Sequence, residues 1–171
     1  LAKGEGLSAV FDRLRAPPER SVAFTIAVIA LSAKMAKADG RVTRDEVTAF
    51  RQVFHIPPEE EAAAARVFNL AREDVAGFEE YAARIARMFR AEGKPCGADS
   101  VLCDLMEGLF HIATADGEYH PAEDAFLARV AEIFGMGEVG FRRIRARWVE
   151  GAAPDPWTVL GVAQDAPMSE I

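Results

Sequence analysis

A ten-residue stretch that occurs twice places the strongest constraint on the fold of this chain. The first copy reads KADGRVTRDE (37–46) and the second reads TADGEYHPAE (114–123). Each copy follows a long apolar segment, as expected where a helix ends at a glycine and a new helix begins a few residues later. The repeat therefore predicts two related helix–turn–helix units. The corresponding positions are Asp39 and Asp116, Gly40 and Gly117, and Glu46 and Glu123.

Each copy also contains the start of a helix. Thr43 and Glu46 form a Thr-x-x-Glu capping box, in which the threonine oxygen accepts an unpaired amide and the glutamate reaches back to the cap residue. Gly40 suits the left-handed conformation with which a helix commonly ends. In the second copy His120 occupies the position of Thr43, so we expect it to serve the cap of its own helix.

Helical patterns extend through the rest of the chain, where apolar residues recur at spacings of three and four. The segment 21–38 is apolar on nearly all sides, which places it in the middle of a bundle. We expect an all-α bundle of about seven or eight helices that contains the two related units. The predicted helices cover about 6–15, 21–38, 43–54, 59–71, 78–92, 99–115, 121–134 and 138–150.

Length and composition limit the number of domains. The chain has 171 residues, half of them hydrophobic, which is enough for one core. We assign residues 1–150 to one helical domain and the segment GAAPDP (151–156) to a linker, because of its Gly and Pro content. The remaining residues, 157–171, are too few to fold alone.

The charge balance narrows the classes of partner. A net charge of −7 argues against nucleic-acid binding, which needs an excess of lysine and arginine. The basic run RRIRARW (142–148) has the spacing of a solvated helix face. The longest apolar stretch, residues 22–33, is shorter than the roughly 20 residues that cross a bilayer, so we expect a buried helix and a soluble fragment. No signal peptide is visible, and because the chain begins with Leu1, an upstream anchor would leave no trace here.

Few residues suggest catalysis or a transition metal. Cys96 and Cys103 lack the C-x-x-C spacing of a zinc site. We expect two free thiols in a reducing compartment, with a disulfide in an extracellular protein as the alternative. His111 lies in an apolar helical stretch, where a satisfied core histidine is expected, and His55 stands alone. No Ser-His-Asp or Cys-His pairing can be placed, so we expect no enzymatic activity.

The paired Asp-Gly units inside an all-helical chain resemble the TerB-like family, the helical module associated with tellurite resistance. The resemblance covers roughly residues 22–148. The tail carries a second resemblance, because DPWTVLGVAQDAPMSEI (155–171) is similar to the start of a J-domain, with an aromatic-x-Val-Leu-Gly-Val pattern at 157–162. No His-Pro-Asp loop follows, so residues 157–171 resemble a truncated N-terminal segment of a J-domain.

A TerB-like domain followed by a J-domain is the arrangement of DjlA-type proteins, which are membrane-anchored bacterial DnaJ-like co-chaperones. The resemblance implies an upstream anchor and a location at the cytoplasmic face of the bacterial inner membrane. It also implies a DnaK-type chaperone as the partner of the J-domain, together with an unidentified client or regulatory protein. A homodimer is compatible with the residues. The chain would then supply a non-catalytic regulatory or protein-interaction domain to a stress response.

The repeated carboxylates support a second hypothesis, a divalent-cation or tellurite-stress sensor. Asp39, Glu46, Asp116 and Glu123 would approach one another if the two units pack about an approximate two-fold axis. Oxygen ligands of this kind suit Ca²⁺ or Mg²⁺, and the TerB-like resemblance implies an acidic cation-binding cluster. Without the D-x-D-x-D-G pattern of an EF-hand, the cation would be bound weakly. The alternative is that the aspartates close turns and the glutamates cap helices, with no further function.

Overall fold

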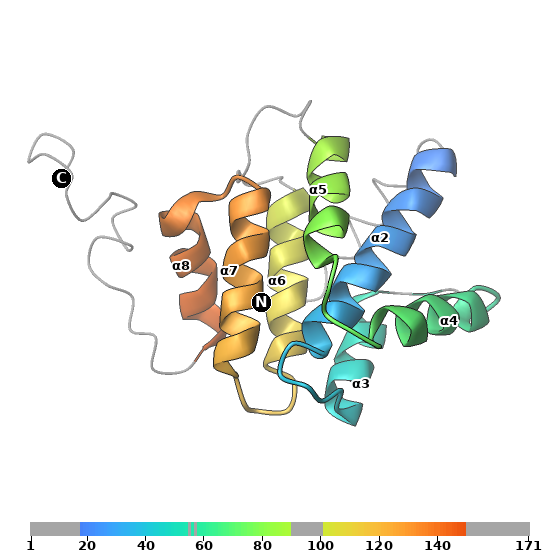
Figure 1. Ribbon diagram of the computed structural model, residues 1–171, viewed down its shortest axis with the longest axis horizontal. Coiled ribbons are helices and arrows are strands. Elements are labelled where there is room, and N and C mark those ends of the chain that lie inside the picture. Colours follow the sequence, from blue (N-terminus) through green and yellow to red (C-terminus); the bar gives the residue numbers. More distant parts are fainter. Residues whose placement is uncertain (1–17, 55, 57, 90–100, 150–171) are drawn as a thin grey trace, which may run out of the picture.

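The computed structural model describes residues 18–149 except 55, 57 and 90–100. Every regular element within these residues is an α-helix, so the predicted all-α fold is confirmed. Figure 1 shows α8, α7, α6, α5 and α2 side by side from left to right, with α4 lying crosswise beyond α2. The helices are α2 (Pro18–Ala36), α3 (Arg44–Val53), α4 (Glu61–Ala71), α5 (Phe78–Phe89), α6 (Val101–Ala113), α7 (Pro121–Ile133) and α8 (Gly137–Trp148).

The predicted helix boundaries agree with these bounds to within a few residues, with one instructive error. Helix α2 begins at Pro18 rather than at Ser21. Pro18 occupies the first position of the helix, where proline is favourable because its missing N–H would have no partner anyway. The predicted helix at 6–15, the linker at 151–156 and the J-domain-like segment at 157–171 lie outside the described residues.

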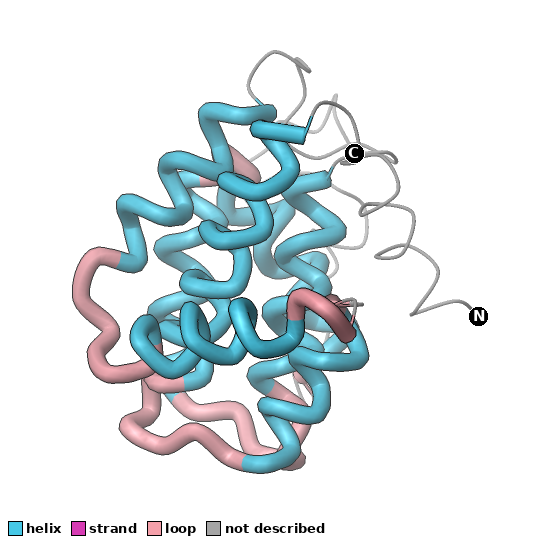
Figure 2. Tube along the Cα trace, turned by 90° about the vertical axis from the view of Figure 1, so that its right-hand side faces the viewer, coloured by secondary structure: helices cyan, strands magenta, loops and turns pink. Residues whose placement is uncertain are grey.

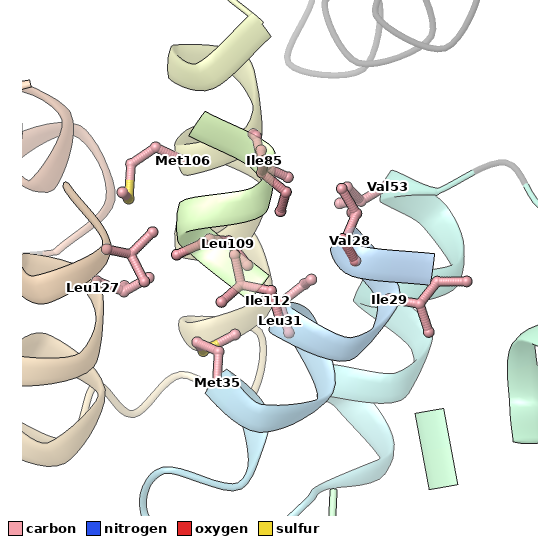
Figure 3. Close-up of a cluster of buried hydrophobic side chains, with 14 of the residues drawn as sticks. Val28, Ile29, Leu31, Met35, Val53, Ile85, Met106, Leu109, Ile112 and Leu127 are labelled. Atoms are coloured by element: carbon pink, nitrogen blue, oxygen red, sulfur yellow. The ribbon is translucent and has the colours of Figure 1, made fainter. Parts of the chain in front are cut away.

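Helix α2 occupies the centre of the bundle, as its uniformly apolar sequence predicted. It packs against α4, α5, α6 and α7. Leu31, Met35 and Ala36 are completely buried. Figure 3 shows Leu31 and Met35 pointing towards the helix that carries Leu109 and Ile112, which is α6. Among the described helices, α2 included, none is long and apolar enough to span a bilayer.

The two repeated units interlock. Helix α3 of the first unit packs against α6 of the second, while α7 of the second unit packs against α2 of the first. Equivalent positions are buried in both units: Phe50 corresponds to Leu127, and Val53 to Val130. Each unit therefore completes the core of the other. The arrangement also places the α2–α3 and α6–α7 connections at the same end of the bundle (Figures 1 and 2).

The expectation of two free thiols is wrong for Cys103, which is disulfide-bonded. Cys103 lies in the first turn of α6 and is partly buried against the core. The chain contains one other cysteine, Cys96, which lies outside the described residues. Residue spacing alone did not indicate the bond, because it does not report the distance between two side chains.

Candidate functional site

The two Asp-Gly turns have the same backbone geometry. Gly40 has a φ of 92° and Gly117 a φ of 84°, in the left-handed region that strains any residue with a side chain. Asp39 Oδ1 accepts the amide two residues ahead at 2.8 Å. Asp116 Oδ1 does the same at 3.0 Å. Each aspartate therefore closes an Asx-turn, which is the structural role predicted for it.

Both glutamates cap the helix that follows their turn. Glu46 Oε2 accepts the Thr43 amide at 2.6 Å and the Thr43 hydroxyl at 2.9 Å, while Thr43 Oγ1 accepts the Glu46 amide at 3.2 Å. Glu123 Oε2 accepts the His120 amide at 2.9 Å. His120 Nδ1 accepts the amide of Ala122 at 3.1 Å. The capping box of α3 is confirmed, and histidine replaces threonine at the cap of α7.

Burial makes both glutamates costly to ionise, since each is only 3% exposed. The pKa of Glu46 rises to about 7, chiefly because burial removes water from the carboxylate, and further because Asp39 and Asp116 are negatively charged. The pKa of Glu123 also rises to about 7, again chiefly through burial, with the charges of Glu46 and both aspartates adding to it. Hydrogen bonds from the cap residues partly oppose both shifts.

The four predicted carboxylates lie close enough for their charges to affect one another's ionisation. We call Asp39, Glu46, Asp116 and Glu123 the carboxylate cluster. Both aspartates act on both glutamates, and Glu46 acts on Glu123 across the boundary between the two units. However, within residues 18–54, 56, 58–89 and 101–149, no three His, Cys, Asp or Glu side chains gather closely enough to hold a metal ion. The carboxylate cluster is coupled through its charges.

The second turn carries a polar network that the sequence reasoning missed. Tyr119 donates its hydroxyl to Asp124 Oδ1 at 2.9 Å. Arg145 of α8 donates Nε to the same oxygen at 2.6 Å, and its guanidinium carbon lies 5.9 Å from the centre of the Tyr119 ring. Burial and the contact with Asp124 raise the pKa of Tyr119 well above its ordinary range. In the sequence, this network could have been inferred from Tyr119, which occupies in the second copy the position that Val42 holds in the first.

A histidine and an arginine near α8 pack against or bond to other side chains of the same chain. The His111 ring centre lies 5.4 Å from that of Trp148, at an edge-on angle. Glu107 of α6 accepts side-chain hydrogen bonds from both Arg147 and Trp148. Part of the RRIRARW run therefore pairs with acidic residues of the same chain, which agrees with the structural interpretation of that run.

A groove between α3 and α4 is a further feature that the sequence did not predict. It has a volume of about 210 Å³, and its apolar lining includes Phe50, Phe54 and Phe68. The ring centre of Phe50 lies 5.0 Å from that of Phe54 and 4.9 Å from that of Phe68, so the three rings form a continuous floor. The exposed residues Arg51 and Arg72 also line the groove. We call this feature the α3–α4 groove.

A known protein family matches the helical bundle. The family described as "Tellurite resistance protein TerB" matches residues 25–146, which is most of the chain. The matched range includes both Asp-Gly turns and the whole carboxylate cluster. The comparisons with curated proteins and with solved structures found no match.

Proposed function

This chain belongs to the TerB family of tellurite resistance proteins, and from that premise we propose that it is a non-catalytic protein-interaction domain acting in a stress response. The observation that carries the proposal is the pairing of a TerB domain with the tail DPWTVLGVAQDAPMSEI (155–171), which is similar to the start of a J-domain. In this proposal the domain belongs to a DjlA-type, DnaJ-like co-chaperone. It brings a client or regulatory protein close to a DnaK-type chaperone at the cytoplasmic face of the inner membrane.

Two experiments test this function. The gene around this chain should encode a membrane span upstream of Leu1 and a His-Pro-Asp loop downstream of Ile171. The protein should also capture a specific partner from an extract of its host, identified by mass spectrometry against an unrelated helical protein as the control. A gene without the His-Pro-Asp loop would contradict the co-chaperone context, and capture at background level would contradict the interaction function.

The carboxylate cluster favours a second candidate function, the sensing of divalent cations. Glu46 and Glu123 are buried side chains whose ionisation is opposed by the charges of Asp39 and Asp116. A bound Ca²⁺ or Mg²⁺ would offset this repulsion with oxygen ligands of the preferred type. Because the described residues contain no group of three ligands close enough for a metal, such binding would be weak and would need the side chains to move.

Thermal unfolding separates this candidate from a purely structural role of the cluster. A cation that binds only the folded chain raises the free energy of unfolding by about 1.4 kcal/mol at a tenfold excess over its Kd. Millimolar Ca²⁺, Mg²⁺, Mn²⁺ or Zn²⁺ should then raise the Tm of the wild type by several degrees. The Asp39→Asn/Asp116→Asn double variant should lose this response. An equal response in both proteins, or none in the wild type, would contradict cation sensing.

A further inference from the structure

The first half of α2 carries a large apolar side chain that the other described helices leave exposed. The sequence of α2 is apolar on nearly all sides, which is typical of a helix that is enclosed by others. Phe24, Ala27 and Val28 are at most 3% exposed, as this pattern predicts, but Ile26 is 44% exposed. Ala23, one turn before Ile26, is exposed as well, and we call these two residues the open face of α2. Figure 1 shows the start of α2 at the edge of the bundle opposite α8.

The segment that precedes α2 has a matching apolar stripe in its sequence, GLSAVFDRLR (6–15), and it lies outside the described residues. Its apolar residues have the spacing of one helix face, namely Leu7, Val10, Phe11 and Leu14. An isolated helix of about ten residues is only marginally stable in water, so a helix here needs an apolar surface on which to bury this stripe. The open face of α2 offers such a surface within the same chain.

Two prolines determine how this segment joins α2. Residues that precede a proline disfavour the α-helical conformation, so a helix in the segment ends before Ala16 and Pro17. Pro18 is the first residue of α2. The connection therefore consists of residues 16–17 alone. A connection of about two to five residues is typical of neighbouring antiparallel helices, so the segment would run back along α2 from its start.

The positions along the two segments place Leu7 beside Ile26. Leu7 lies eight residues before Arg15, and Ile26 lies eight residues after Pro18. At a rise of about 1.5 Å per residue both are about 12 Å from the connection, so they lie at the same level in an antiparallel pair. Val10 and Ala23 correspond in the same way, since each is five residues from the connection. The apolar stripe of the segment thus falls on the open face of α2.

We propose that residues 6–15 form a helix that docks antiparallel on the open face of α2 and covers Ile26 with Leu7. The match to the TerB family begins at residue 25, so the docked helix is an addition in front of the matched bundle. It closes an apolar face of the bundle to other proteins. The inference goes beyond the proposed interaction function and does not depend on it, because both surfaces belong to this chain.

Nuclear magnetic resonance of the full chain tests the contact directly. With labelled leucine and isoleucine methyl groups, Leu7 and Ile26 should show a nuclear Overhauser effect, which requires the two side chains to be close. Leu70 is the control, because it is 69% exposed but lies on α4, whose end is held near Lys34 by the bonds from Lys34 Nζ to Asp74. Lys34 is two turns beyond Ile26 on α2. Leu7 should therefore show no effect to Leu70. Absence of the effect between Leu7 and Ile26 would overturn the proposal.

Hydrogen exchange tests whether the contact stabilises the helix. Amides of residues 10–15 should exchange at least about tenfold faster in Ile26→Glu than in the wild type, because a carboxylate replaces the apolar contact. Leu70→Glu makes the same kind of change at the other exposed apolar residue and should leave this exchange unaltered. Equal exchange in Ile26→Glu and the wild type, or an equal effect of Leu70→Glu, would overturn the proposal.

A second variant keeps the test decisive if Ile26→Glu unfolds the bundle, as judged by circular dichroism. Leu7→Glu lies outside the bundle, and glutamate in the first turn of a helix is favourable. Faster exchange of residues 10–15 in Leu7→Glu would therefore report loss of the contact with α2. Unchanged exchange in Leu7→Glu would overturn the proposal.

A mixed sample identifies which chain supplies the segment. One half of the protein carries labelled leucine methyl groups and the other half labelled isoleucine methyl groups. An effect between Leu7 and Ile26 in this sample can arise only between two copies of the chain. It would assign the open face to a second copy and overturn the proposal. Its absence, together with the effect in the uniformly labelled chain, would support docking within one chain.

Discussion

At the level of single residues, the carboxylate cluster combines a structural role with an electrostatic cost. Glu46 and Glu123 accept the amides of their cap residues and thereby stabilise the starts of α3 and α7. The same side chains are buried near Asp39 and Asp116, which opposes their ionisation. The stability of the fold should therefore depend on the charge state of two residues.

We predict that the domain loses stability as the pH rises from about 5 to about 8. Glu46 and Glu123 have a pKa of about 7 in the folded chain, against an ordinary value of 4.5, so the folded chain holds protons that the unfolded chain has released. Their contribution is fully present below pH 4.5 and is lost as the pH rises through about 7. Urea unfolding should show a loss on the order of 1–3 kcal/mol.

Matched variants show which side chains cause this dependence of stability on pH. Glu123→Gln keeps an acceptor for the cap amide but cannot ionise, so it should flatten the dependence of the unfolding free energy on pH. Glu118→Gln changes a nearby exposed glutamate and should leave that dependence unaltered. A dependence as steep in Glu123→Gln as in the wild type would show that other groups cause it.

The two turns make a second prediction at the level of residues. Gly40→Ala and Gly117→Ala should each lower the free energy of unfolding by about 1–2 kcal/mol, because alanine is strained at positive φ. No atom lies within 4 Å of an added Cβ at either position, so a steric clash adds nothing. Gly140→Ala is the control, since its Cβ would meet Met136 at an ordinary 3.6 Å inside α8. Gly140→Ala should raise the free energy of unfolding, measured by thermal unfolding, by up to about 1 kcal/mol. Equal effects at all three sites would argue against the left-handed turns.

At the level of elements, local signals were predictable and spatial relations were not. The Thr43 capping box and the glycine at the end of α2 act within a few residues, so the sequence located α3 correctly. The coupling of the two glutamates followed only from assuming that the repeats pack about a two-fold axis. The disulfide of Cys103 was only the alternative to free thiols, and the α3–α4 groove was not predicted, because both depend on how separate segments approach each other.

We make one prediction about the interface between α6 and α8. Glu107→Ala removes the acceptor of side-chain hydrogen bonds from Arg147 and Trp148. We expect a loss of about 1–2 kcal/mol, since a partly buried donor is left without this partner. Hydrogen exchange should accelerate in α8 more than in α2, and Glu107→Gln should have a smaller effect because it keeps an acceptor. Equal acceleration in both helices would contradict a local role for Glu107.

At the level of the whole molecule, the interlocked units make folding a property of the complete bundle. Helix α3 packs on α6, and α7 packs on α2, so the core of each unit is completed by the other. The buried side chains form one cluster that extends over all described helices. The duplicated sequence therefore does not correspond to two independent folding units.

We predict that a fragment of residues 101–149, which contains α6, α7 and α8, does not fold alone. Leu109, Phe110 and Ile112 are at most 1% exposed in the complete chain, and removal of α2 and α3 would return much of their surface to water. Circular dichroism should show little helix and no cooperative thermal transition for this fragment. Mixing it with a fragment of residues 18–89 should restore a transition whose midpoint rises with concentration, because folding then requires association. Cooperative unfolding of fragment 101–149 by itself would show that the second unit has a sufficient core of its own.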